Sequence, residues 1–149
     1  MNKIDFKNIK NQFDSNINLL DDSIYNGGIF SFSICLDNVG PNQLIANPNF
    51  HLDPIFFSDS DSSFLAFKKE KVFSFSNGEE LEFLEEKISN FIQDTFFINK
   101  ETQNQKTFIF GGHAFNIDSI NDDLWSGIPI GNFILPRYIF CNSKLIINF

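Results

Sequence analysis

The last part of the chain, FILPRYIFCNSKLIINF (133–149), decides the fold. Two apolar runs, FILPRYIF (133–140) and KLIINF (144–149), flank the polar segment CNSK (141–144). Both runs are rich in β-branched and aromatic residues, and a short polar segment between two such runs is typical of a β-hairpin. We therefore expect two antiparallel strands here. Because the sequence ends within the second run, we expect that strand to lie at a sheet edge or to pair with further sheet, as in a chain that stops partway through a larger fold.

Further strands are predicted upstream of this hairpin. IFSFSICLD (29–37) alternates apolar and polar residues, which indicates a half-buried strand. SSFLAF (62–67) and KVFSFS (71–76) alternate in the same way and flank the charged run KKEK (68–71). The pattern predicts a second hairpin with its turn at KKEK. TFIFGG (107–112) is predicted to be a strand as well.

Two segments have helical periodicity. Residues 3–20 carry apolar side chains at helical spacing, namely Phe6, Ile9, Phe13, Ile17 and Leu20. Residues 79–97 do the same with Leu81, Leu84, Ile88, Phe91 and Ile92. A capping box at the start of the second helix could use Ser76 with Glu79 or Asn77 with Glu80.

The order helix, strands, helix, strands predicts an α+β fold with a mostly antiparallel sheet and helices packed outside it. A chain of 149 residues has the usual size of one domain, and no internal repeat divides it. We expect residues 1–149 to form either a single domain or the incomplete N-terminal part of a larger one.

Composition and charge exclude several classes of protein. Asp and Glu outnumber Lys and Arg by 19 to 11, and the net charge of −8 disfavours binding to the phosphates of nucleic acids. No segment approaches the roughly 20 apolar residues of a membrane span, and the first residues lack the apolar core of a signal peptide. We expect a cytoplasmic protein that binds neither nucleic acid nor membrane. Cys35 and Cys141 belong to no CxxC motif, and we expect each to be a buried reduced thiol.

The segment KTFIFGGHAF (106–115) is the strongest candidate for a ligand loop, but its spacing argues against one. A phosphate-binding loop requires GxGxxG or GxxxxGK[ST] before a helix, and GGHAFN fits neither pattern. His51 and His113 are the only histidines, too few for a metal site without several carboxylates. We expect Gly111 and Gly112 to serve backbone geometry, through a bulge or bend with a close approach of neighbouring chain.

Other chemical candidates are also better explained by structure. SDSDSS (58–63) lacks the glycine and terminal glutamate of a calcium loop, so a solvated turn is expected. The glutamates of the second helix lie mainly opposite its apolar face, and no GxSxG motif supports a Ser-His-Asp triad. Trp125 is expected in the core. Arg137, the only arginine, could bind a carboxylate ligand or form a structural ion pair, and the sequence leaves both open.

One resemblance to a known family covers the last forty residues well and residues 50–110 loosely. FIFGGHAF (108–115), LW (124–125) and NFILPRYIF (132–140), in this order, resemble the chorismate-utilising enzymes, most closely isochorismate synthase. The resemblance implies two stacked antiparallel sheets with helices outside. It also implies conversion of chorismate to isochorismate with Mg²⁺, in menaquinone or phylloquinone synthesis or in salicylate and siderophore synthesis.

The same resemblance implies that the catalytic residues lie elsewhere. The lysine that activates water, the glutamate that acts as an acid and the acidic metal ligands belong to the C-terminal part of these enzymes. No residue of this chain matches those motifs, so no catalytic, cofactor-binding or metal-binding residue is assigned. Three hypotheses follow. The first is an N-terminal part of an isochorismate synthase that is inactive alone, either as a truncated gene product or as one piece of a split protein whose companion chain carries the catalytic part. The second is a non-catalytic binding or scaffold module, and the third is the same part of an anthranilate or salicylate synthase.

Overall fold

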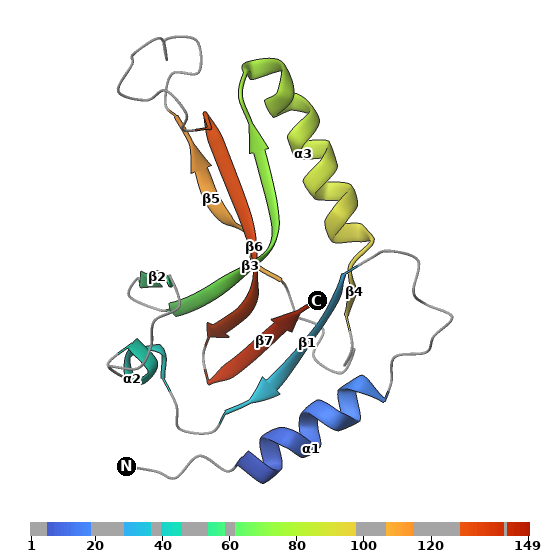
Figure 1. Ribbon diagram of the computed structural model, residues 1–149, viewed down its shortest axis with the longest axis vertical. Coiled ribbons are helices and arrows are strands. Elements are labelled where there is room, and N and C mark those ends of the chain that lie inside the picture. Colours follow the sequence, from blue (N-terminus) through green and yellow to red (C-terminus); the bar gives the residue numbers. More distant parts are fainter. Residues whose placement is uncertain are drawn as a thin grey trace.

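The fold is built around one mixed sheet with helices beside it (Figure 1). The computed structural model describes residues 6–18, 29–36, 40–45, 54–58, 62–97, 107–114, 129–141 and 143–149. The helices are α1 (Phe6–Ile17), α2 (Pro41–Ile45) and α3 (Gly78–Gln93). The strands are β1 (Phe30–Cys35), β2 (Ile55–Ser58), β3 (Ser63–Phe75), β4 (Phe96–Phe97), β5 (Phe110–His113), β6 (Gly131–Cys141) and β7 (Lys144–Asn148).

The strand order is β2-β3-β6-β7-β1-β4, and β5 pairs with β6 beside this path. Every pairing is antiparallel except the short parallel contact between β1 and β4, so the predicted α+β class is confirmed. The predicted C-terminal hairpin is confirmed as well, because β6 pairs with β7 from Tyr138–Ile147 to Cys141–Lys144.

The predicted edge position of the last strand is wrong. β7 lies between β6 and β1, and Phe149 exchanges backbone hydrogen bonds with Phe30 at 2.8 and 3.1 Å. Its apolar sequence is therefore explained by burial on both sides within the sheet, with Ile146 and Ile147 6% and 8% exposed.

The predicted hairpin at KKEK is also wrong, because residues 63–75 form the single long strand β3. Lys69 pairs with Pro136 and Lys71 pairs with Leu135, so Glu70 is an additional residue in β3, a β-bulge. Lys68, with φ of 57°, lies in the left-handed region next to it. A charged run that interrupts an alternating pattern is compatible with a turn or with a bulge, and only the pairing partner distinguishes them. Pro136, opposite the bulge, occupies one of the few places where a sheet tolerates proline.

The bulge changes which face of the sheet β3 presents. Before it, Leu65 and Phe67 pair with Phe140 and Tyr138. After it, Phe73 pairs with Phe133, which lies an odd number of positions from Phe140 and Tyr138 and so on the other face of β6. One strand thereby contributes to cores on both faces of the sheet.

These cores are apolar clusters covered by different elements. Phe73 and Phe75 pack with Leu84 of α3 at one end of the sheet. At the other end, Phe30, Phe32, Ile34 and Ile147 pack with Ile9 and Ile17 of α1. Figure 1 shows α3 along the upper half of β3 and α1 beside β1 at the bottom of the view. The predicted position of helices outside the sheet is confirmed.

The helix boundaries differ in part from the predictions. The first helix is described from Phe6 to Ile17, and Leu20 lies outside the described residues. The second begins at Gly78 with Asn77 as N-cap, whose Oδ1 accepts a hydrogen bond from the Glu80 backbone N–H at 2.9 Å. The Glu80 carboxylate accepts from the Ser76 N–H at 2.7 Å, so the second alternative has the observed N-cap, but its return bond goes to the residue before the N-cap and not to Asn77 as in a capping box. The helix ends at Gln93, because Phe96 and Phe97 join the sheet as β4.

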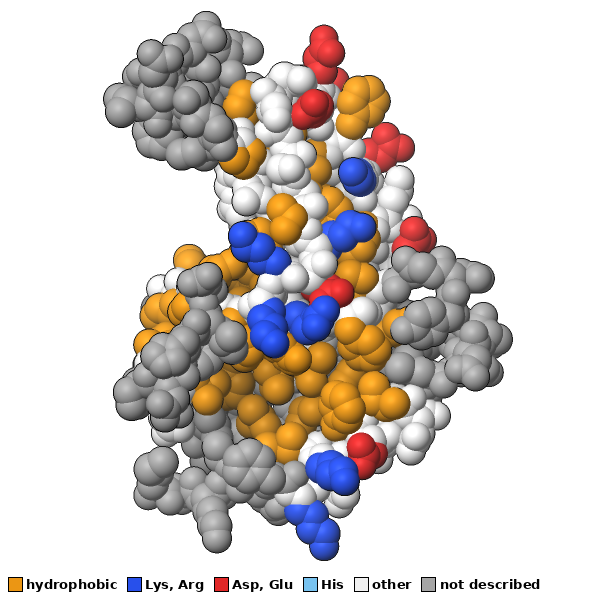
Figure 2. Space-filling view, viewed as in Figure 1, with side chains coloured by type: hydrophobic (Ala, Val, Ile, Leu, Met, Phe, Trp, Pro, Cys, Tyr) orange, Lys and Arg blue, Asp and Glu red, His pale blue; other side chains and the backbone are white. Residues whose placement is uncertain are grey.

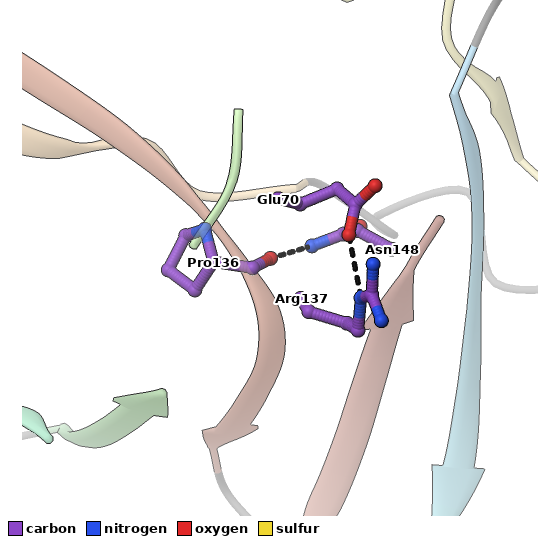
Figure 3. Close-up of polar contacts among 4 residues, drawn as sticks. All are labelled: Glu70, Pro136, Arg137 and Asn148. Atoms are coloured by element: carbon purple, nitrogen blue, oxygen red, sulfur yellow. Dashed lines mark hydrogen bonds and ion pairs between the residues drawn. The ribbon is translucent and has the colours of Figure 1, made fainter. Parts of the chain in front are cut away.

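A buried amide joins β6 and β7 where they diverge. β6 pairs on this edge with β5 through residues 131–134 and with β7 through residues 138–141. Asn148, fully buried, donates a hydrogen bond from Nδ2 to the Pro136 carbonyl oxygen at 2.7 Å (Figure 3). Its Oδ1 accepts a hydrogen bond from the Thr107 hydroxyl at 3.2 Å. The side chain thus satisfies a carbonyl in the interval between the two partner strands.

Gly111 and Gly112 have different environments, although the sequence predicted one role for both. A Cβ at Gly111 would lie 2.6 Å from Cα of Phe133 and closer still to the Asn132 carbonyl oxygen. A Cβ at Gly112 would meet nothing within 4 Å. The predicted close approach of neighbouring chain is therefore confirmed for Gly111 and wrong for Gly112.

We predict that Gly111→Val lowers the free energy of unfolding by about 3 kcal/mol or more, because backbone atoms cannot yield as a side chain can. Gly112→Val, the matched control, should change it by less than about 1 kcal/mol, because valine suits an exposed strand position. Urea unfolding of both variants measures the difference. Equal losses at the two positions would contradict the assigned close approach.

We predict that Asn148→Leu lowers the free energy of unfolding by about 2–4 kcal/mol, since it leaves the buried Pro136 carbonyl without its donor. Thr107→Val removes only the weaker bond and should cost about 1 kcal/mol. In a double-mutant cycle, the loss of unfolding free energy in the double variant should be smaller than the sum of the two single losses, because the two side chains are bonded to each other. Strict additivity would show that they act independently.

Candidate functional site

The candidate site lies where β6 passes the bulge of β3, and Arg137 is its central residue. The Nε–H of Arg137 donates a hydrogen bond to Oε2 of Glu70 at 2.5 Å, across from the bulge (Figure 3). This bond and the charge of Glu70 raise the pKa of Arg137 above its ordinary value. The Arg137 side chain is 44% exposed, and within the described residues its two terminal nitrogens have no hydrogen-bond partner. Of the two roles left open by the sequence, the structural ion pair is observed, and it leaves part of the guanidinium available.

A hollow of about 260 Å³ adjoins Arg137 between α1 and the sheet. Its walls are formed by Phe13 and Ile17 of α1, Arg137 and Tyr138 of β6, Ile147 of β7, and Phe149. Tyr138 and Ile147 are cross-strand partners, so the floor follows directly from the β6–β7 register. Phe13 and Phe149 each pack edge-on against the buried ring of Phe32, with centroids 5.6 and 5.8 Å away. The buried ring of Phe32 therefore supports both aromatic walls of the hollow.

A second cation lies beside this hollow. The Nζ of Lys68 lies 5.8 Å from the ring centroid of Tyr138, which lines the hollow, whereas the Nζ of Lys71 lies 5.9 Å from that of Phe91 on α3, outside the lining. Figure 2 shows an apolar patch on this face with Lys and Arg side chains along its upper margin and one acidic group among them. The chain has a net charge of −8, so this positively charged margin is opposite in sign to the protein as a whole.

His113 contributes no converging chemistry. It is exposed at the end of β5, its Nδ1 lies 2.8 Å from the Ala114 carbonyl oxygen, and its ring centroid lies 6.3 Å from that of Phe75. Within the described residues, no group of three His, Cys, Asp or Glu side chains could hold a metal ion. His51, Asp59, Asp61 and Trp125 lie outside those residues.

The two cysteines differ in environment. Cys141 is 8% exposed, and burial raises the pKa of its thiol, an effect that nearby Lys144 reduces. Cys35 is exposed, so the predicted burial is confirmed for Cys141 and wrong for Cys35. Both are free thiols. No described helix has the length and apolar character needed to cross a membrane.

A family model described as chorismate binding enzyme matches residues 16–146. The chain belongs to this family. The match contains β1 to β6 and most of β7, and it includes three of the six residues that line the hollow: Ile17, Arg137 and Tyr138. No curated protein and no solved structure matches the chain.

Two of the three motifs behind the resemblance lie side by side in the sheet, and the third, LW (124–125), lies outside the described residues. FIFGG (108–112) leads into β5, and NFILPRYIF (132–140) lies in β6, with Phe110 opposite Ile134. Sequence reasoning identified Arg137 but missed the hollow. Phe13 and Ile17 were recognisable as one helical face, but their position over Tyr138, Ile147 and Phe149 depends on sheet order.

We predict that the two thiols react with a disulfide reagent at different rates. Cys35 should react quickly in the native protein, and Cys141 should react only as the protein unfolds, because burial hinders access and disfavours the thiolate. Cys35→Ser should abolish the fast phase. A fast phase that persists in Cys35→Ser would contradict the assigned environments.

The raised pKa of the Cys141 thiol also predicts a pH dependence of stability. The pKa of Cys141 is higher in the folded protein than its ordinary value of 9.0, so its contribution to stability is fully present below pH 9.0 and is lost as pH rises further. Cys141→Ala should weaken this loss, and Cys35→Ala, the control, should not. Urea unfolding at pH 8 and about pH 10 compares the variants.

Proposed function

We propose that this chorismate binding enzyme is the N-terminal part of an isochorismate synthase, and that its own residues contribute fold and binding rather than catalytic groups. The family match over residues 16–146 carries the proposal. The resemblance of FIFGGHAF (108–115) and NFILPRYIF (132–140) to isochorismate synthase supports the specific activity.

The residues of the described part do not fit the Mg²⁺ that such enzymes use. No three acidic or histidine side chains converge there, and Mg²⁺ needs carboxylate oxygens in near-octahedral geometry. We therefore derive no step through the metal. In the proposed enzyme, the lysine, the glutamate and the metal ligands belong to a companion part of the protein.

The proposed contribution of the chain to fold and binding is supported by the long β3–β6 pair and by exposed aromatic residues of β2. β3 and β6 pair from Phe64–Cys141 to Phe75–Gly131, and this long pair anchors the apolar clusters. Phe56 and Phe57 of β2, an end strand of the described sheet, are 46% and 52% exposed. Such exposed aromatic residues suit contact with further protein, which supports a companion part rather than an isolated enzyme.

We predict that the purified 149-residue chain does not convert chorismate in the presence of Mg²⁺. Isochorismate formation is measured by chromatography, with a characterised isochorismate synthase as the positive control. Turnover by the chain alone would contradict the proposed absence of catalytic groups.

The DNA downstream of this coding sequence provides the complementary test. We expect it to continue, in frame or after one frameshift, into a part that contains the catalytic lysine and glutamate. Co-expression of both parts should then give isochorismate from chorismate. Formation of anthranilate or salicylate instead would replace the specific activity, and a chain that is monomeric, melts cooperatively and has no such neighbour would favour a binding or scaffold module.

A further inference from the structure

We propose that the hollow between α1, β6 and β7 is a binding site for a small aromatic monocarboxylate. The carboxylate would accept hydrogen bonds from the terminal nitrogens of Arg137, and the ring would lie against the apolar walls. This site is separate from the catalytic groups of the proposed function, none of which lies in the described residues, and the proposal does not depend on that function.

The walls favour a flat apolar body. Five of the six lining residues are apolar or aromatic: Phe13, Ile17, Tyr138, Ile147 and Phe149. Phe13 is 38% exposed, so its ring offers a free surface for edge or stacking contact. A volume of about 260 Å³ equals the liquid share of roughly nine water molecules, which accommodates one six-membered ring with its carboxylate. A nucleotide would exceed it.

The charge at the margin favours an anion of one specific kind. Among the described residues, Arg137 is the one charged residue that lines the hollow, and a guanidinium pairs with a carboxylate through two parallel hydrogen bonds. Lys68, whose Nζ lies over Tyr138 at 5.8 Å, adds a second positive charge near the same wall. The other lining residues that the structure describes are uncharged, so the geometry suits a single carboxylate at one end of an apolar molecule.

Glu70 makes the proposal specific, because it already binds Arg137. Its carboxylate accepts a hydrogen bond from Nε at 2.5 Å, and it therefore orients the guanidinium while it neutralises part of its charge. A ligand carboxylate must share Arg137 with Glu70. Removal of the negative charge from Glu70 should strengthen ligand binding, whereas removal of the positive charge from Arg137 should weaken it.

The test is a titration of the isotope-labelled chain with benzoate, followed through the methyl signals of its isoleucines. The signals of Ile17 and Ile147, which line the hollow, should shift with a Kd of about 0.1–1 mM, an affinity expected for a ligand of about ten non-hydrogen atoms at a half-open site. The signal of Ile92, on α3 and outside the hollow, should stay in place. Benzamide, which has the same shape without the charge, should bind at least about tenfold more weakly.

Three variants separate recognition from folding. Arg137→Gln should weaken benzoate binding about tenfold, and Glu70→Gln should strengthen it about threefold. Lys10→Gln, an exposed change on α1 outside the lining residues, should leave the Kd unchanged. Both variants break the ion pair, so a Kd that depended only on the ion pair would change in the same direction in both. Opposite changes of the Kd therefore identify a ligand site.

The proposal is overturned by any of three results. The first is equal binding of benzoate and benzamide. The second is a change of the Kd in the same direction in Arg137→Gln and Glu70→Gln. The third is the absence of a shift at Ile17 and Ile147 up to the solubility limit of benzoate. An unchanged methyl spectrum of each variant without ligand is the control for folding.

Discussion

The pairing of β3 with β6 across the additional residue Glu70 is the constraint on which the rest of the structure depends. β2 pairs with β3, and β5 and β7 pair with β6, while β1 and β4 follow beyond β7. Because the bulge moves the side chains of β3 to the other face, Leu65 packs with Phe140 while Phe73 packs towards α3. Without the additional residue, Phe73 and Phe75 would turn away from the helix that covers them.

The bulge also determines the local chemistry. It places Glu70 across from Arg137, and Pro136 lies opposite, where its missing N–H is tolerated. The Pro136 carbonyl is satisfied by the buried Asn148 side chain, so a polar group deep in the sheet depends on a residue near the end of the chain. Figure 3 shows these two interactions side by side: one orients a partly exposed cation, and the other secures the strand behind it.

For a member of the chorismate binding enzyme family, this arrangement separates two kinds of residue. The motif glycine Gly111 serves packing, because a side chain there would collide with the backbone of β6. Arg137, in the same region of the sheet, has a side chain that is 44% exposed and lines an apolar hollow. A residue can therefore mark the family through its structural role, and a neighbouring residue can provide the binding chemistry.

The sequence by itself determined the local elements. Alternation identified β1, two apolar runs around a polar segment identified β6 and β7, helical spacing identified α1 and α3, and the pairing of Asn77 with Glu80 was among the two caps considered. These features depend on neighbours along the chain, which the sequence displays directly. It also singled out Arg137 and left its role open.

Only the tertiary structure decided the rest, because the deciding contacts join residues far apart in the chain. KKEK became a bulge because β6, more than 60 residues later, pairs along the whole of β3. The last strand became internal because β1 pairs with its free edge. Gly111 and Gly112 are alike in sequence and differ only in what approaches them, and the hollow beside Arg137 exists because Phe13 and Ile17 of α1 lie near Tyr138 and Ile147 of the β6–β7 hairpin.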